Sequence, residues 1–226
     1  MYSGVKTWNP LAGFCQHECL YCSTISLRSR YQACAAKYSG EYRIYEHEMK
    51  NLGKNKEIFV CAQNDLFEAT VPAEIIHRIL KHTRNADKSN LFMFQTKNPA
   101  RFHEFLDEIP ENCMLGTTIE TDRRDLINEF SNAPAPYSRS SAMMNVTGFK
   151  KYITIEPSME CNLNILYCLV QRAKPDKVFI GADSKGHGLP EPAAFKIHIM
   201  IDLLGKITEV EIKDNLHRLI NNGGKT

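Results

Sequence analysis

Three cysteines near the N-terminus have the residue type and spacing that most clearly point to chemistry. Cys15, Cys19 and Cys22 form a C-x3-C-x2-C array within the stretch GFCQHECLYCS. Iron–sulfur clusters are bound by cysteine thiolates, and a cubane cluster normally takes four of them. Three thiolates in one loop leave one iron without a local protein ligand, and such an open position can bind a chelating ligand. The array therefore predicts a [4Fe–4S] cluster with one open iron.

Zinc is the alternative metal for these cysteines. A structural zinc ion takes four ligands, and His17 or Cys34 could supply the fourth. Zinc modules usually combine two closely spaced ligand pairs, and the sequence contains no second pair. We therefore favour the iron–sulfur interpretation and expect His17 to be an exposed residue of the loop. The remaining cysteines are scattered, which is typical of small buried side chains.

Composition limits the class of protein. The chain has 226 residues, of which 43% are hydrophobic and 24% charged, as in a soluble globular protein with one domain spanning 1–226. A formal charge of +2 offers no general support for nucleic-acid binding, although a local basic groove remains compatible with it. Neither a secretory signal nor an apolar run of roughly 18 residues is present, so we expect a cytoplasmic protein.

Recurring short apolar runs predict the strands that position the cysteines. These runs lie at 57–62, 91–96, 114–120, 151–156, 177–182 and, more weakly, 207–213. Helical periodicity is found at 26–38, 72–84, 99–109, 163–173 and 193–205. Strands that alternate with helices predict a parallel α/β sheet covered on both faces. The order fits an open doubly wound sheet or a partial or complete TIM-like (β/α) barrel of about six parallel strands.

One segment breaks the alternation of strands and helices. Residues 131–150 are rich in Ser, Ala, Pro and Asn and show no clean period, so we expect an irregular loop there. Each predicted strand is followed by polar residues, and the carboxyl ends of parallel strands meet at one edge of the sheet. We therefore expect these polar groups to share a cavity, with loop capping as the alternative for any single residue.

The cysteine array also resembles a known signature. The C-x3-C-x2-C array with an aromatic residue, Tyr21, directly before the third cysteine resembles the signature of the radical S-adenosylmethionine (radical SAM) superfamily. Gly13 and Phe14 before the first cysteine suit a tight entry into the loop. In that superfamily S-adenosylmethionine chelates the open iron. One electron then cleaves it to a 5′-deoxyadenosyl radical, which abstracts hydrogen from a substrate. The resemblance implies a radical SAM enzyme with a partial-barrel core, served by an external flavodoxin- or ferredoxin-like electron donor.

More of the chain resembles one branch of this superfamily. That branch is phage-associated and functionally uncharacterised, and its layout is distantly similar to spore photoproduct lyase. The segments that carry the resemblance are TWNP (7–10), NDLF (64–67), QTKNPARF (95–102), GTTIE (116–120), ITIEP (153–157) and VFIGADS (178–184). The chain departs from the branch at Ala182 and Asp183, where the branch has Gly and Glu, and at Ser158 and Met159, where it has leucines.

The resemblance also implies a cofactor site across the strand ends. The residues assigned to S-adenosylmethionine are Tyr21 beside the adenine, Asn64 and Asp65 near the amino group, Thr118 and Glu120 at the ribose, and next Glu156 and Asp183. A salt bridge or loop cap is the alternative role for each carboxylate. Cys61 is a candidate donor of a hydrogen atom to a product radical.

The substrate and two other function classes stay open. Lys97, Lys185 and Lys213 end three strands and could contact an anionic substrate, which together with the phage-like background suggests a nucleotide or nucleic acid. One alternative is an iron–sulfur protein that transfers electrons without radical catalysis. The other is a zinc-stabilised module that binds nucleic acid.

Overall fold

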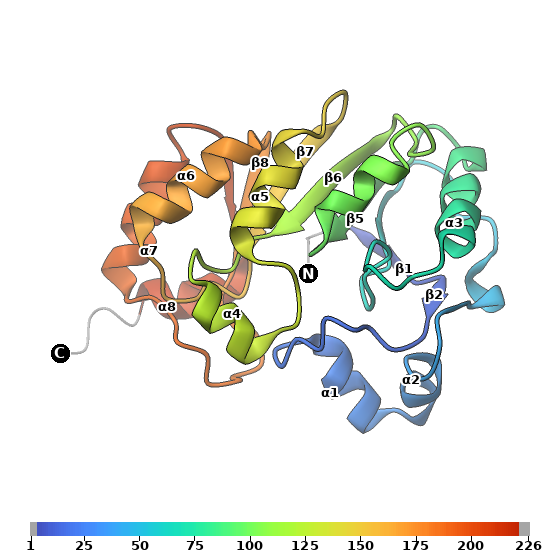
Figure 1. The fold of residues 1–226 in the computed structure, drawn as a ribbon, viewed down its shortest axis with the longest axis horizontal. Coiled ribbons are helices and arrows are strands. Elements are labelled where there is room, and N and C mark those ends of the chain that lie inside the picture. Colours follow the sequence, from blue (N-terminus) through green and yellow to red (C-terminus); the bar gives the residue numbers. More distant parts are fainter. Residues whose placement is uncertain (1–3, 222–226) are drawn as a thin grey trace.

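A seven-stranded parallel sheet forms the centre of the molecule in the computed structural model, which describes residues 4–221 (Figure 1). The strands, in their order across the sheet, are β1 (Lys6–Trp8), β4 (Glu57–Val60), β5 (Leu91–Thr96), β6 (Cys113–Thr118), β7 (Lys150–Ile155), β8 (Lys177–Ile180) and β9 (Glu209–Ile212). Every neighbouring pair is parallel. Within the described residues β1 and β9 do not pair, so the sheet is open.

The sheet confirms the predicted parallel α/β architecture. All six strands expected from apolar runs are present, and the seventh, β1, has only three residues, too few to produce a recognisable pattern. The helices are α1 (Ser23–Arg30), α2 (Gln32–Lys37), α3 (Ala73–Asn85), α4 (Arg124–Phe130), α5 (Pro136–Met144), α6 (Leu163–Ala173), α7 (Ala194–Leu204) and α8 (His217–Asn221). Short 3-10 helices lie at Glu46–Glu48, Pro99–Glu104 and Asp214–Leu216. Of the helices in this part of the chain, none is long and apolar enough to cross a membrane.

The N-terminal helices lie apart from the sheet. The antiparallel strands β2 (Leu11–Ala12) and β3 (Arg43–Ile44) bracket the cysteine loop, α1 and α2. In Figure 1 these blue elements extend beyond the edge of the sheet, whereas α5 and α6 lie against it. The predicted helix at 26–38 is two helices, because Tyr31 has an extended backbone (φ −127°, ψ 116°).

Two further segments differ from their predicted structure. The helix expected at 99–109 is a 3-10 helix over Pro99–Glu104. Phe102 within it and Phe105 directly after it are both buried, at the i, i+3 spacing of that helix type. The segment 131–150 is not an irregular loop, because it contains α5. Pro136 occupies the first turn of α5, where a missing N–H costs nothing, but this signal was hidden by the polar composition.

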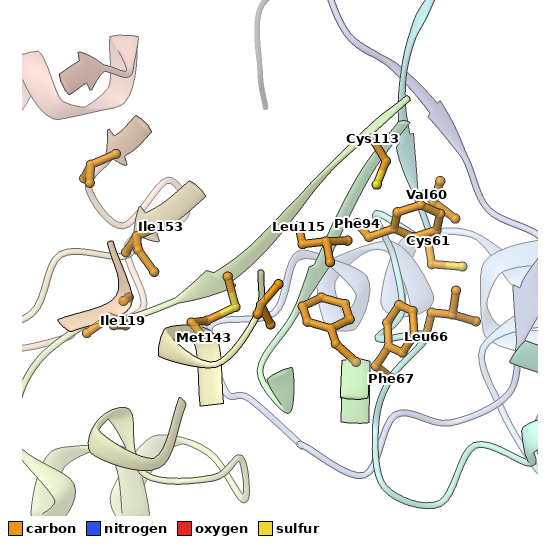
Figure 2. Packing of buried hydrophobic residues seen from close by; sticks show 14 of the residues in the cluster. Val60, Cys61, Leu66, Phe67, Phe94, Cys113, Leu115, Ile119, Met143 and Ile153 are labelled. Carbon is orange, nitrogen blue, oxygen red and sulfur yellow. The ribbon is translucent and has the colours of Figure 1, made fainter. Parts of the chain in front are cut away.

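The hydrophobic core supports the strand ends directly. Phe67, in the loop after β4, is fully buried and stacks edge-on with Phe102 (ring centroids 4.7 Å apart) and Phe94 (6.1 Å). Figure 2 shows Phe67 and Leu66 in the same cluster as side chains from the neighbouring strands β4, β5, β6 and β7. Burying a phenylalanine contributes about 2–3 kcal/mol. This packing fixes the loop that carries Asn64 and Asp65.

Gly116 on β6 gives a direct test of the packing on the other face of the sheet. A Cβ there would lie 2.3 Å from the ring of Tyr152, which is fully buried and packs edge-on against Phe179. Gly116→Ala should lower the free energy of unfolding by about 2 kcal/mol in urea titrations, because the ring has no room to move. Gly205 lies at an exposed helix end with φ −60°, so Gly205→Ala should lower the free energy of unfolding far less. A Gly116→Ala protein as stable as the wild type would contradict this packing.

Candidate cofactor site

The cysteine array lies in a loop between β2 and α1, and its entry is fixed by backbone contacts. Gly13 has φ +115°, and a Cβ there would lie 2.7 Å from the Cα of Tyr42, so only glycine fits. The N–H of Gly13 donates to the carbonyl of Lys37 (2.9 Å), and the N–H of Phe14 donates to that of Gly40 (3.0 Å). The segment after α2 therefore holds the start of the loop.

The link between α4 and α5 holds the middle of the cysteine loop. Leu20 donates its N–H to the carbonyl of Phe130 (2.9 Å), and Asn132 donates its N–H to the carbonyl of His17 (2.7 Å). The hydroxyl of Ser131 lies 3.1 Å from the sulfur of Cys19. The loop is thus paired to a segment that lies more than 100 residues later in the chain.

A buried carboxylate holds the loop from the sheet side. Asp65 accepts hydrogen bonds from His17 Nε2 (2.9 Å), from the backbone N–H of Lys97 (2.8 Å) and from that of Phe67 (3.0 Å). Burial alone raises the pKa of Asp65, but the hydrogen bond and charge of His17 and the Lys97 N–H outweigh burial and leave it below its usual value. His17 is 5% exposed, so the expectation of an exposed loop histidine was wrong. Its buried partner explains the difference.

Asn64 completes this attachment. Its side-chain Nδ2 donates to the carbonyl of Gly13 (3.0 Å), while its Oδ1 accepts from the N–H of Asp65 (3.0 Å). Gln63 adds a third contact, because its carbonyl accepts from the hydroxyl of Thr24 at the start of α1 (2.8 Å). The polar residues after β4 therefore hold the cysteine loop and the start of α1 by hydrogen bonds.

All three cysteines of the array line one cavity at the carboxyl ends of the strands. Its volume is about 410 Å³. The cavity also contains three of the predicted residues, Asn64, Asp65 and Thr118, together with the sulfur-bearing side chain of Cys61. Burial, with a smaller effect of the Asp65 charge, raises the pKa of the Cys15 thiol well above its usual value.

The cavity suits the predicted cluster in its donor chemistry. Three thiols from one loop face a common space, which is the ligand set that a cubane with one open iron requires. Across residues 4–221, no three His, Cys, Asp or Glu side chains stand in the arrangement of a preformed metal site. The three thiols thus line a common cavity but are not arranged as ligands around a single metal position.

A second cavity of about 530 Å³ adjoins the first. Tyr21, Glu156 and Asp183, three of the predicted cofactor residues, line it. The two cavities have four lining residues in common, namely Phe59, Ala62, Gln63 and Gln95. The cleft therefore runs from the cysteines across the strand ends, and six of the seven predicted cofactor residues lie along it. Glu120 lines neither cavity.

The two carboxylates of the second cavity already have partners. Glu156 accepts from Lys213 Nζ (2.6 Å) and from Asn215 Nδ2 (2.7 Å). Asp183 accepts from the N–H of Lys185 (3.0 Å) and from the ring of His187 (2.6 Å). Glu156 therefore forms a salt bridge and Asp183 caps its own loop, which are the two alternative roles that the sequence left open for these carboxylates. The structure thus brings both residues to the cleft and leaves their binding role untested.

Glu120 lies behind the cleft, where the structure shows a residue that the sequence did not reveal. The Glu120 side chain is completely buried and accepts from Arg139 Nη1 (2.7 Å) and from the hydroxyl of Tyr21 (2.7 Å), and it forms an ion pair with Lys97. The sequence did not reveal Arg139, because this residue lies in the segment predicted to be an irregular loop. The available signal for this residue was Pro136, which is typical of a helix start, followed by one charged side chain among small and polar residues.

Comparison with solved structures defines the class of fold. Spore photoproduct lyase in complex with dinucleoside spore photoproduct matches with a TM-score of 0.64 and 12% identity, over 90% of this chain and 76% of that one. A mutant of that enzyme with bound AdoMet and dinucleoside spore photoproduct gives a TM-score of 0.56 and 15% identity, over 88% of this chain and 60% of that one. The chain is therefore an α/β protein with the fold of spore photoproduct lyase.

The family is defined by sequence. The chain belongs to the family described as proteins of unknown function (DUF5131), whose profile matches residues 4–184. The match includes the cysteine loop and the strands from β1 to β8. No curated protein sequence matches significantly. The association with phages stays a prediction.

Replacing Asp65 tests the attachment of the loop. Asp65→Asn places an amide N–H₂ opposite a donor, so the free energy of unfolding should fall by about 1–3 kcal/mol in urea titrations at neutral pH. Because the folded-state pKa is depressed below 3.8, the stabilisation is present above that pH. It is lost as the pH falls through the folded-state pKa, so the two proteins should converge in acid.

Asp87→Asn is the matched control. Asp87 also accepts the N–H of the second residue along the chain, Ser89 (2.9 Å), but it is exposed. Asparagine supports the same turn, so this variant should stay within about 0.5 kcal/mol of the wild type. Equal losses in both variants would mean that the buried contacts of Asp65 contribute nothing particular.

Proposed function

We propose that this protein is a radical SAM enzyme that binds a [4Fe–4S] cluster through Cys15, Cys19 and Cys22. The observation that carries the proposal is that these three thiols line one cavity at the carboxyl ends of a sheet with the fold of spore photoproduct lyase. When bound, the cluster would supply the electron that cleaves S-adenosylmethionine to a 5′-deoxyadenosyl radical. An external flavodoxin- or ferredoxin-like protein is the proposed source of that electron.

The protein's own residues would bind and orient the cofactor in the cleft. Tyr21 and Thr118 contribute the walls near the array, and the carboxylates of Glu156 and Asp183 lie farther along. Phe59 lies where the two cavities meet, and its apolar ring would help to exclude water from this part of the cleft when the cofactor is bound. Asn64 and Asp65 line the cysteine cavity, and the contacts described above engage them in holding the loop. Their proposed contact with the amino group would come in addition.

Cys61 is the proposed donor of a hydrogen atom to a product radical. It is 3% exposed and lines the same cavity as the cysteine array. Burial raises the pKa of Cys61 to about 12, so the thiol keeps its S–H at neutral pH. Only a thiol with its hydrogen in place can donate a hydrogen atom. A Cys61→Ala enzyme that turns over substrate normally would remove this role.

A nucleotide or nucleic acid is the proposed substrate. The solved relative holds a dinucleoside spore photoproduct, and the second cavity of this chain is lined by Arg30, Lys185 and Lys213. Cationic side chains that line a cleft favour a phosphate-bearing ligand. Addition of the right substrate should accelerate formation of 5′-deoxyadenosine, whereas an unrelated anion should leave the rate unchanged.

Reductive cleavage of S-adenosylmethionine tests the proposal. Protein purified without oxygen and reconstituted with iron and sulfide should turn brown and form 5′-deoxyadenosine when dithionite and S-adenosylmethionine are added. Replacing any one of the three array cysteines with alanine should lower product formation below detection, because the cluster loses one of three protein ligands.

Cys168→Ala is the control for this experiment. Cys168 is exposed on α6 and lies outside the cleft, so the variant should bind as much iron and form as much product as the wild type. A brown protein that neither binds nor cleaves the cofactor would instead indicate an electron-transfer protein. A colourless protein that retains zinc would overturn the proposal altogether.

A further inference from the structure

Glu120 sits at the carboxyl end of β6 in a place that water does not reach. Its side chain is 0% exposed, and so is that of its partner Arg139 on α5. The Oε2 atom of Glu120 accepts from Arg139 Nη1 at 2.7 Å, and its Oε1 atom accepts from the hydroxyl of Tyr21 at 2.7 Å and pairs with Lys97. Both carboxylate oxygens are therefore occupied by side chains of the protein.

The geometry of Arg139 is fixed independently of Glu120. Its Nε donates to the carbonyl of Pro134 (2.6 Å), and its Nη1 also donates to the carbonyl of Thr118 (3.0 Å). A guanidinium is planar and permanently charged, so these contacts orient the whole group. A carboxylate removed from water needs a paired charge, and Arg139 supplies one in a set position.

Tyr21 links this buried pair to the cysteine array. It lies between Cys19 and Cys22 in the sequence, and its hydroxyl donates to Glu120 while accepting from Lys97 Nζ (2.8 Å). The same ammonium lies 4.6 Å from the centre of the Tyr21 ring. Both the tip and the face of the ring are thus held. Tyr21 also lines the second cavity, where the cofactor is proposed to bind.

We infer that Arg139 and Glu120 are positioning residues for the second half of the cysteine array. They hold Tyr21, and through it the backbone from Cys19 to Cys22, while the carbonyl of Phe130, the last residue of α4, accepts the N–H of Leu20 in the same stretch. Glu120 accordingly acts on the cofactor through Tyr21 instead of binding the ribose. The part that concerns the cofactor rests on the proposed function, whereas the ordering of the loop does not.

Hydrogen–deuterium exchange of the metal-free protein tests the ordering of the loop. The amides of Leu20, Cys22 and Ile25 are hydrogen-bonded and report on this stretch. Tyr21→Phe, which removes only the hydroxyl, should speed their exchange about tenfold. R139Q should do so as well, and R139K, which keeps the charge, should lie closer to the wild type.

Arg78→Gln is the matched control, because Arg78 pairs with Glu46 at 2.7 Å on the surface. It should leave exchange of the cysteine loop unchanged. If R139Q fails to fold, Tyr21→Phe still decides the outcome. Unchanged exchange in a folded Tyr21→Phe protein would overturn the inference.

The cofactor part is tested on the reconstituted protein. Tyr21→Phe should bind as much iron per chain as the wild type and raise the KM for S-adenosylmethionine about tenfold, with a much smaller change in kcat. A merely structural role would lower iron content and leave KM alone, and that result would overturn this part. A wild type that forms no 5′-deoxyadenosine would refute the proposed function, and the exchange experiment would still decide whether Arg139 and Glu120 order the loop.

Discussion

Two buried carboxylates attach the cysteine loop to the sheet, and the arrangement of the candidate site depends on them. Asp65 follows β4 and binds His17, whereas Glu120 follows β6 and binds Tyr21. A carboxylate in a dry environment is stable only when hydrogen-bond donors or cations surround it, so each one fixes its partners closely. Loop residues without helical or strand hydrogen bonds thereby acquire defined positions over the cleft.

The sheet provides the rigid base for these contacts. Neighbouring strands are parallel, so the residues that follow β4 and β6 emerge at the same edge. The aromatic cluster around Phe67 packs beneath that edge and holds the loop after β4 in place (Figure 2). Binding residues are often placed on a loop that a rigid scaffold positions, and the cysteine loop on this sheet follows that arrangement.

Local sequence patterns predicted most of the sheet and the helices that have a clear apolar face. The continuous apolar runs at β4 to β8 are long enough to show their type, and α3 and α6 present one apolar face each. Strand β1 was missed because three residues carry no period. Helix α5 was missed because its buried face includes Arg139 and Ser140, which a hydrophobic pattern does not count.

Most residues of the candidate site were predicted from the sequence, but the role of each residue was predicted less well. The resemblance to the radical SAM superfamily implied seven cofactor residues at the strand ends, and six of them line the cleft in the structure. The sequence could not show that His17 pairs with a residue 48 positions away, or that Glu120 meets Arg139 across 19 positions. Long-range partners decide whether a carboxylate faces a ligand or holds a loop, and no local pattern encodes them.

Electron paramagnetic resonance of the reduced, reconstituted protein tests the central claim most directly. If three cysteines leave one iron open in the cleft, adding S-adenosylmethionine will change the g-values of the reduced cluster, because the cofactor becomes a ligand of that iron. A spectrum that is the same with and without saturating S-adenosylmethionine would contradict an open iron at this site.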